Sequence, residues 1–362
     1  MILQFGAGNF LRAFADLFID QANRDASTAV GPVVLVQSTG RERVDALNAA
    51  GCRYHVAIQG RLNGAVVDET EQVNCIESAL HAGTQWDRVL EAGADPRLSM
   101  ILSNTTEAGL ALADEDRVAG GVLRSFPAKL LAVLLHRYRA GLPGPWVVPC
   151  ELVEANGARL RDLVLEQAAL WGVDAETVQW LREECRWVNT LVDRIVPGAP
   201  RVHPLLDVDP LLIAAEPFAF WAVETEADFP LKHPAIVTAR DIAPYTLRKV
   251  RILNGAHSAL VSKGAAFGIE TVRECVEHPE VGPWLHRLLF DEIVPVLEGR
   301  CDDPKGFAEA VLDRFRNPFI DHRLASIALH HEAKVAVRLR PTVVEYRERF
   351  GESPELLSEV CP

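Results

Sequence analysis

Short apolar runs alternate with stretches of helical periodicity from the first residue to about residue 225. Turn residues bound most of the runs, and helix-length segments separate them, so the pattern predicts strands joined by helical crossovers. We therefore expect an α/β fold built on an open, doubly wound, mainly parallel sheet. The expected strands are 2–5, 32–37, 55–59, 98–103, 146–150, 187–192 and 218–223, and the expected helices are 10–24, 41–50, 84–91, 126–139, 156–170 and 174–185.

The strand signals end near residue 240. Pro230, Pro234 and Pro244 mark a junction there, since proline interrupts both helices and sheet ladders. A chain of 362 residues is long enough for two domains. We expect an α/β domain at 1–238 and a mostly α-helical domain at 239–362. The expected helices of the second domain are 245–267, 270–275, 282–298, 304–314 and 321–331.

The chain opens with a strand, a glycine turn and a helical segment in that order. Ile2–Phe5 is apolar, Gly6-Ala-Gly8 follows, and Ala13–Asp20 has helical periodicity. A dinucleotide-binding fingerprint requires this order, in which the first glycine permits the tight turn and the second lets the backbone approach the pyrophosphate at a helix N-terminus. Leu11 occupies the place of the third glycine, so a plain turn remains an alternative. The turn favours a Rossmann-like domain.

The second expected strand bears on the choice of dinucleotide. Pro32–Gln37 is almost entirely apolar, as in a parallel strand that is covered on both faces. NAD-specific sites usually carry Asp or Glu after this strand to bind the ribose 2′-hydroxyl. This chain has Gln37 and Ser38 there, with Arg41 and Arg43 close by. NADP is therefore not excluded, because arginine accommodates a 2′-phosphate.

Composition excludes several classes of function. The net charge of −13 disfavours nucleic acid as a partner, because the chain has no basic excess. No run of 18 apolar residues and no signal-peptide pattern occurs, so we expect no membrane partner. Seven cysteines without a C-x-x-C motif suit a reducing compartment and argue against structural zinc. We expect a cytoplasmic protein that acts on a small molecule.

Polar clusters stand where several expected strands end. Ser103-Asn104-Thr105 follows one strand, Glu151 and Asn156 follow the next, and Asp193 follows a third. Ligands of open α/β sheets bind outside the carboxyl ends of the strands. Helix caps and turns explain the same residue types equally well. The clusters are therefore site candidates by topology alone.

The segment Lys249-Val-Arg-Ile-Leu-Asn254-Gly-Ala-His257 places three polar side chains in an otherwise apolar helix. At 100° per residue, Asn254 and His257 lie about 140° and about 80° round from Lys249, so the three share one half of the helix surface. Such residues can supply a proton-transfer group, a carbonyl-polarising donor and an orienting imidazole. A solvated polar face is the alternative explanation.

Together these motifs resemble the mannitol dehydrogenase family of polyol-specific long-chain dehydrogenases, and within it the tagaturonate reductase subfamily. The family has Lys-x4-Asn-x2-His on a helix of its second domain, and Lys249, Asn254 and His257 match that spacing without a gap. The other matching segments are Gln4–Arg12, Ser103–Gly109, Phe126–Lys129, Pro149–Leu152, Asn189–Pro197 and Ala243–Lys249.

The resemblance implies a metal-free NAD-dependent dehydrogenase with its active site in a cleft between the two domains. It makes Lys249 the general acid/base, Asn254 and Asn156 the donors to the developing alkoxide, and His257 the group that orients the substrate. It implies substrate contacts for Val192, Asp193 and Arg323, with Arg248 and Lys232 as further candidates for a uronate carboxylate. The implied cofactor-binding residues are Gly6, Gly8, Asn9, Phe10, Arg12, Gln37, Ser38, Ser103, Asn104 and Thr105.

The expected reaction is the reduction of tagaturonate to altronate, with a sugar acid or polyol as the small-molecule partner and a monomer favoured over an oligomer. Fructuronate, mannitol or fructose, and sugar phosphates remain alternative substrates. A dinucleotide-binding sensor without turnover is an alternative of another class. Relatives usually carry a leading segment and more helix after the position of Pro362, so we expect a less enclosed substrate side. His330 and His331 point about 100° apart on a helix and are expected at the surface rather than on a metal.

Overall fold

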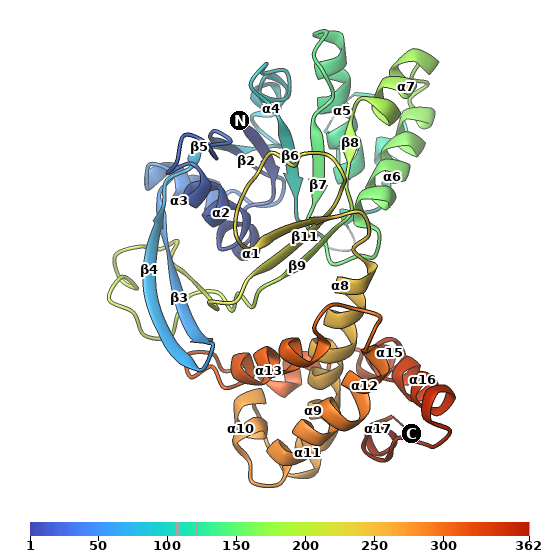
Figure 1. Cartoon of the computed structure of the whole chain (residues 1–362). Coiled ribbons are helices and arrows are strands. Elements are labelled where there is room, and N and C mark those ends of the chain that lie inside the picture. The colour runs from blue at the N-terminus through green and yellow to red at the C-terminus, as the bar shows by residue number, and fades with distance from the viewer. Residues whose placement is uncertain (106–108, 121, 362) are drawn as a thin grey trace. The chain divides into compact units, whose positions relative to one another are not determined.

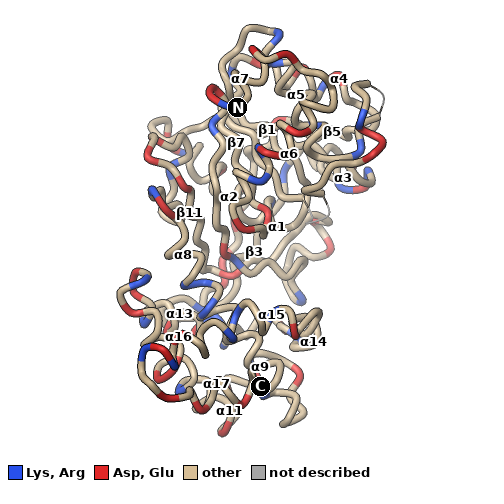
Figure 2. Tube along the Cα trace, turned by 90° about the vertical axis from the view of Figure 1, so that its right-hand side faces the viewer, with Lys and Arg blue, Asp and Glu red and all other residues tan. Residues whose placement is uncertain are grey.

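The computed structural model describes residues 1–105, 109–120 and 122–361. The chain divides into two compact units (Figure 1). The first unit contains residues 1–57, 70–215 and 219–242, and the second contains 58–69, 216–218 and 243–362. Two short segments within the range expected for the α/β domain, 58–69 and 216–218, thus group with the second unit. Acidic and basic residues are interspersed over both units (Figure 2).

The first unit is built on a six-stranded sheet with the order β5-β2-β1-β6-β7-β8. All five strand pairs are parallel. Taken in chain order within this sheet, the strands follow the sequence 3-2-1-4-5-6 of doubly wound dinucleotide-binding folds, so the fold prediction is confirmed. The strands are β1 (Ile2–Phe5), β2 (Val33–Gln37), β5 (Ile76–His81), β6 (Met100–Ser103), β7 (Trp146–Pro149) and β8 (Arg186–Trp187).

One face of this sheet packs against four helices. Alternate strand residues such as Leu3, Val34, Ile101 and Val147 point to this face, because side chains alternate along a strand. The Ser125 hydroxyl caps the helix that begins at Phe126 by accepting a hydrogen bond from the backbone of Ala128. The helices are α4 (Trp86–Gly93), α5 (Phe126–Arg139), α6 (Asn156–Leu170) and α7 (Ala175–Glu183), and α3 (Glu42–Ala49) packs beside β2 and β5.

The opposite face is covered by short helices and a second sheet. The helix expected at 10–24 is interrupted at Phe14, whose φ of −129° and ψ of −84° are not helical. This leaves α1 (Asn9–Arg12) as a single turn before α2 (Ala15–Ala22). Phe14 packs on Trp221 of the second sheet, with 5.3 Å between the ring centroids. That sheet has the order β12-β11-β9, with β9 (Thr190–Asp193), β11 (Phe220–Glu224) and β12 (Ile236–Ala239).

Several strands differ from expectation. The single strand expected at 187–192 is divided between β8 of the large sheet and β9 of the second one. A third sheet has the order β10-β3-β4, with β3 (Tyr54–Leu62), β4 (Ala65–Val73) and β10 (Ile213–Ala215). Strand β4 is rich in acidic residues and mostly exposed, so it lacks the apolar alternation that identifies a strand. A short 3-10 turn, η2 (Asp114–Asp116), precedes α5.

The second unit is helical. Helix α8 (Ala243–Arg248) passes into a π-helical turn, η3 (Lys249–Asn254), and then into α9 (Gly255–Ala266). Buried side chains of η3 and α9, including Leu253 and Leu260, join one core with the surrounding helices. The other elements are α10 (Val272–Glu277), α11 (Val281–Arg287), η4 (Leu288–Ile293, π-helical), α12 (Val294–Leu297), α13 (Pro304–Phe315), α14 (Leu324–Ile327), α15 (His331–Arg338), α16 (Arg340–Phe350) and α17 (Glu355–Val360).

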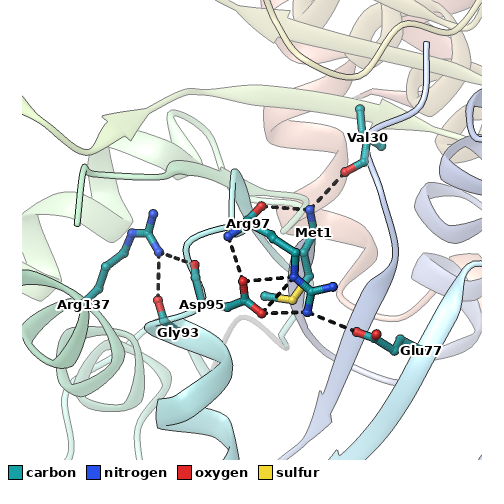
Figure 3. A network of polar contacts seen from close by, with 7 residues as sticks. All are labelled: Met1, Val30, Glu77, Gly93, Asp95, Arg97 and Arg137. Atoms are coloured by element: carbon teal, nitrogen blue, oxygen red, sulfur yellow. Dashed lines mark hydrogen bonds and ion pairs between the residues drawn. The ribbon is translucent and has the colours of Figure 1, made fainter. Parts of the chain in front are cut away.

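A buried arginine ties helix α5 to the loops at its C-terminal end. Arg137 is 1% exposed, and its guanidinium donates to the carbonyl oxygens of Gly93 and Asp95 (Figure 3) and to those of Leu98 and Pro143, all at 2.6–3.1 Å. Four carbonyl acceptors replace the water that this cation loses on burial, which is the condition for keeping a charge inside a protein. The arginine thus fixes the start of β6, whose other end reaches the edge of the sheet that carries the site candidates.

A buried carboxyl group lies beneath the glycine turn. Asp16 is fully buried and accepts hydrogen bonds from the Tyr54 hydroxyl at 3.1 Å and from the Gln4 amide at 3.4 Å. Burial raises the pKa of Asp16 from 3.8 to about 7, although these hydrogen bonds and the Arg12 charge oppose the rise. The folded protein therefore binds a proton here more tightly than the unfolded chain does.

Asp16→Asn is expected to flatten the pH dependence of stability. A raised pKa in the folded state gives stability that is present below pH 4 and lost as the pH rises toward 7. The full shift corresponds to roughly 4 kcal/mol. Urea unfolding of both proteins at several pH values between 5 and 8 measures the difference. Asp162→Asn, which removes an exposed carboxylate, controls for the loss of one charge. Parallel profiles for wild type and Asp16→Asn would contradict the assignment.

Candidate functional site

The carboxyl ends of three neighbouring strands of the first unit are aligned. Phe5 of β1 is in register with Ser103 of β6, and Ser103 is in register with Pro149 of β7. The strand order reverses between β1 and β6, because β2 lies on the other side of β1. Open α/β sheets bind ligands in the crevice at such a reversal. The loops that start at Gly6, Asn104 and Cys150 therefore meet where a dinucleotide is expected.

The glycine loop has the features that a pyrophosphate requires. Gly6 has a φ of +128°, and a Cβ placed there would lie 3.2 Å from the backbone oxygen of Asn104. Only glycine fits this close turn. A Cβ at Gly8 would meet nothing within 4 Å, so the backbone is open to a ligand there. The residues of the loop thus fit a dinucleotide, although α1 is too short to contribute much of a helix dipole.

Arg12 supports the loop from below. It is 3% exposed, and its guanidinium donates to the Leu211 carbonyl at 2.9 Å and to the Asn9 side chain at 3.0 Å. Burial lowers the pKa of Arg12 to about 10. The guanidinium also lies 5.2 Å from the centroid of the Tyr54 ring. Arg12 therefore orients Asn9 and holds the loop in place, while Phe10 stacks on Phe14 at 4.8 Å.

No acidic side chain follows β2 at the position that binds a ribose in NAD-specific sites. Gln37 donates to the Thr39 carbonyl at 2.6 Å and accepts from the Val44 backbone at 3.1 Å, so its amide shapes the turn. Ser38 is exposed. Arg43 reaches back to the glycine loop and donates to the Ala7 carbonyl at 3.0 Å. Arg43 therefore contributes a positive charge beside the loop.

Glu151 fastens the ends of β6 and β7 together. Its carboxylate accepts hydrogen bonds from the Ser103 hydroxyl at 3.1 Å and from the Thr105 backbone at 2.8 Å. Asn104 donates to the Cys150 carbonyl at 2.6 Å in the same junction. Burial raises the pKa of Glu151, and the hydrogen bonds oppose that rise. The sequence shows Glu151 as a polar residue after a strand, but nothing in the sequence predicts its hydrogen bonds to Ser103 and Thr105.

Asn156 begins helix α6 and is 1% exposed. Its Nδ2 lies 3.0–3.2 Å from acceptors on Pro149, Glu151 and Thr190, and its Oδ1 accepts from the backbones of Gly157 and Thr190 at 2.9 Å. An amide has two hydrogens, so more acceptors surround Nδ2 than it can serve at once. In this structure Asn156 therefore joins β7, α6 and β9, and its role as a donor to substrate stays a prediction.

The predicted substrate residues occupy different surroundings. Val192 and Asp193 end strand β9, two and three residues after the Thr190 that contacts Asn156, and both are buried. Arg323 precedes α14 in the second unit; its side chain is 59% exposed and pairs with Glu270 at 3.2 Å. The structure therefore brings Val192 and Asp193 to the strand that contacts Asn156, whereas Arg323 lies in an exposed ion pair.

Lys249, Asn254 and the residues between them form the π-helical turn η3. A π-helix closes its hydrogen bonds over five residues, so Lys249 and Asn254 stand above one another as residues four apart do in an α-helix. The angle of about 140° expected for a regular α-helix is therefore wrong, and the two residues share a face more closely than expected. Single π-turns inside α-helices are frequent at functional sites.

His257 follows one turn later in α9 and is 8% exposed. Its ring stacks on Phe315 at 4.5 Å and meets the edge of His322 at 4.7 Å. Burial, and then the positive charges around it, hold the pKa of His257 well below its usual range. Its Nε2 has no hydrogen-bond partner among the described residues. The segment therefore presents a lysine, an amide and a neutral imidazole.

Two features are absent from residues 1–105, 109–120 and 122–361. Within these ranges, no group of three or more His, Cys, Asp or Glu side chains is placed to hold a metal ion. No helix in the same ranges is long and apolar enough to cross a membrane. His331 is half-buried and bonded to Ser262 at 3.0 Å, whereas its neighbour His330 is exposed.

Both parts of the chain match models of one protein family. Residues 1–237 match the Rossmann domain of mannitol dehydrogenase, and residues 241–361 match its C-terminal domain. Altronate oxidoreductases of Bacillus subtilis and Phocaeicola vulgatus are 40% and 38% identical to the chain, covering 98% of it and 77% of each relative.

Two solved structures share the fold at 23% identity. A D-sorbitol dehydrogenase in substrate-free form superposes with a TM-score of 0.83 over 96% of this chain and 76% of its own. Mannitol 2-dehydrogenase of Pseudomonas fluorescens, in a ternary complex with NAD and D-mannitol, superposes with a TM-score of 0.78 over 99% and 77%. These findings confirm the expected oxidoreductase class, and the chain belongs to the mannitol dehydrogenase family.

Proposed function

We propose that this protein transfers a hydride between a nicotinamide dinucleotide and a hexuronate, reducing tagaturonate to altronate. The likeness to altronate oxidoreductases over 98% of the chain supports the substrate class. The observation that carries the chemistry is the alignment of Lys249, Asn254 and His257 along one π-turn and the helix that follows it. Mannitol, fructose and sugar phosphates are the competing substrates within the family.

The cofactor of the proposal is NAD, held by the glycine loop and the strand ends of the first unit. Gly8 leaves space for the pyrophosphate, and Asn9, Phe10, Ser103, Asn104 and Thr105 surround the place where strand order reverses. When bound, the nicotinamide supplies or accepts the hydride. The solved mannitol 2-dehydrogenase relative holds NAD, which favours NAD over NADP.

Lys249 is the proposed acid/base. In the reducing direction its Nζ gives a proton to the substrate keto oxygen, and in the oxidising direction it takes the proton back. Asn254 donates a hydrogen bond to the same oxygen as negative charge develops on it. A neutral His257 orients a neighbouring hydroxyl without adding a second positive charge beside Lys249.

The proposal gives the first unit a supporting part in the same reaction. Asn156 is the second donor to the substrate oxygen, which would take the place of one of the acceptors now crowding Nδ2. Asp193 accepts hydrogen bonds from substrate hydroxyls at the end of β9. Residues from both 1–238 and 239–362 thus contribute to the proposed active site.

Lys249→Ala is expected to lower turnover by about 100-fold or more while leaving NADH binding intact, because the proton donor is lost and the dinucleotide loop is untouched. Loss of NADH absorbance with tagaturonate measures turnover, and NADH fluorescence measures binding. Lys263→Ala on the same helix, where the lysine pairs with Glu359 at 2.7 Å, is the matched control and should stay near wild type. Near-wild-type turnover in Lys249→Ala would overturn the mechanism.

A substrate and cofactor panel tests the reaction itself. Wild type is expected to turn over tagaturonate faster than fructuronate and fructose, and to prefer NADH to NADPH. Arg43→Ala is expected to weaken binding of both dinucleotides, because Arg43 braces the glycine loop through Ala7. Binding of NADH without turnover of any of the three substrates would favour the sensor alternative, and a preference for NADPH would reverse the cofactor assignment.

A further inference from the structure

Helices α9 and α15 of the second unit pack together along a basic seam. His331, Lys334 and Arg338 follow one another on α15 at the spacing i, i+3 and i+7, so they share one face of that helix. Two of them bond to α9, since His331 meets the Ser262 hydroxyl at 3.0 Å and Arg338 donates to the Ser258 hydroxyl at 3.2 Å. This face of α15 is therefore turned toward the helix that carries His257.

Arg338 has no carboxylate partner among the described residues, although it is half-buried. Its pKa is lowered, and burial is the cause. Lys334 stands four residues before it on the same helix, and two like charges at that spacing repel one another. Lys334 donates to the Ile327 carbonyl at 2.8 Å and forms no ion pair within the described chain. Glu332 is exposed.

Other buried arginines of the second unit are neutralised. Arg314 makes a two-pronged pair with Glu216 at 2.7 and 3.0 Å, and both side chains are 2% exposed. Arg251 pairs with Glu345 at 3.0 Å and 3.2 Å. Desolvating a guanidinium without an anion costs free energy that such pairs recover. Arg338 stands out because Ser258 gives it a fixed position but no compensating charge.

Arg338 lies beside the segment 249–257, which carries the proposed acid/base and the orienting imidazole. Ser258, which holds Arg338, is the next residue after His257. His322, Arg314, Arg338 and Lys249 all lower the pKa of His257, and Arg314 is matched by the Glu216 carboxylate. The Nε2 of His257 itself has no hydrogen-bond partner in the part of the chain that the structure describes. A ligand that contacts His257 and Lys249 thus enters a region of positive potential.

We propose that Arg338, positioned by Ser258, binds the carboxylate of the sugar-acid substrate. The inference rests on the proposed function and deepens it, because it names the group that separates a uronate from a neutral ketose. A guanidinium fork matches a carboxylate with two parallel hydrogen bonds. The other sequence candidates already have partners: Arg323 pairs with Glu270, Arg248 donates to the Asp302 carbonyl, and Lys232 pairs with Asp228.

The test compares a charged substrate with a neutral one. Arg338→Met keeps the length of the side chain and removes the fork. Its KM for tagaturonate is expected to rise about 100-fold with a smaller change in kcat, because a charge-assisted pair to the ground-state carboxylate is lost. Its KM for fructose, or the inhibition constant of mannitol, is expected to change less than about twofold, because neither compound carries a carboxylate. Arg338→Lys should recover part of the loss.

Controls separate binding from folding. Arg340→Met removes an exposed arginine two residues away and should leave both substrates unaffected. Ser258→Ala removes the anchor without altering α15 and should raise the KM for tagaturonate several-fold, so the idea stays testable if Arg338→Met folds poorly. NADH fluorescence and the unfolding midpoint check the dinucleotide site and the fold of each variant. Altronate should raise the unfolding midpoint of wild type in the presence of NADH, and Arg338→Met should lose that rise.

The outcomes distinguish two failures. Tagaturonate turnover by wild type together with an unchanged KM in Arg338→Met and Ser258→Ala would overturn the inference and leave the proposed function standing. Equal losses for tagaturonate and fructose would also overturn it, because they indicate a structural role. Absence of turnover and of altronate binding in wild type would overturn the proposed function, and the inference would fall with it.

Discussion

A polar group taken out of water must find a partner, and this requirement organises the sheet edge of the first unit. Glu151, which follows β7, accepts hydrogen bonds from Ser103 and Thr105 at the end of β6, and Asn156 bonds to three backbone segments. Arg137 is satisfied by carbonyl oxygens alone. These contacts hold the strand ends in one line. The glycine loop beside this edge leaves open space at Gly8.

The exceptions to this rule are informative. Among the described residues, Gln4, Asp16 and Arg12 each keep one buried atom without a hydrogen-bond partner, and all three lie beneath the glycine loop. The raised pKa of Asp16 supplies a reason, since a proton turns one carboxyl oxygen from an acceptor into a donor. The unpartnered Nε2 of His257 has a different setting, because the groups acting on it are positive and include Lys249. The first group of atoms lies in the core beneath the glycine loop, and the His257 nitrogen lies in the candidate site.

Periodicity in the sequence predicts the doubly wound class, most strands of the sheet and the helices that cover it, because a parallel strand covered on both faces reads as an unbroken apolar run. It misses β5 (Ile76–His81), whose sequence mixes polar with apolar residues. It does not predict β4, whose acidic residues face solvent and whose pairing depends on β3. It also misses the break at Phe14, where packing on Trp221 accompanies a loss of helical geometry. At Phe14 the contact is with a segment distant in sequence, whereas β4 depends on pairing with the strand directly before it.

The sequence likewise predicts only some of the site residues. Residue types and spacing point to Lys249, Asn254 and His257, but they assume a regular helix, and the π-turn sets the real relation between the first two. Nothing in the sequence around Arg338 marks it as a site residue. What distinguishes Arg338 is its hydrogen bond to Ser258 of α9 and the lack of an ion pair within the described chain. The family resemblance points to Arg323 as the substrate arginine, but in the structure its side chain lies in an exposed ion pair with Glu270.

The net charge of the chain is −13, so the charges close to the site decide whether it can bind an acidic substrate. Exposed carboxylates act on a bound anion through water and salt, which screen them beyond about 8–10 Å. A half-buried guanidinium acts at close range with less screening. Burial, and then the positive charges around it, hold the pKa of His257 well below its usual range, so the imidazole adds no positive charge beside Lys249. Under the proposed function, the site thus needs one unpaired cation for the carboxylate and one titratable amine for the reaction. Pairing Arg314 with Glu216 leaves Arg338 for the first task and Lys249 for the second.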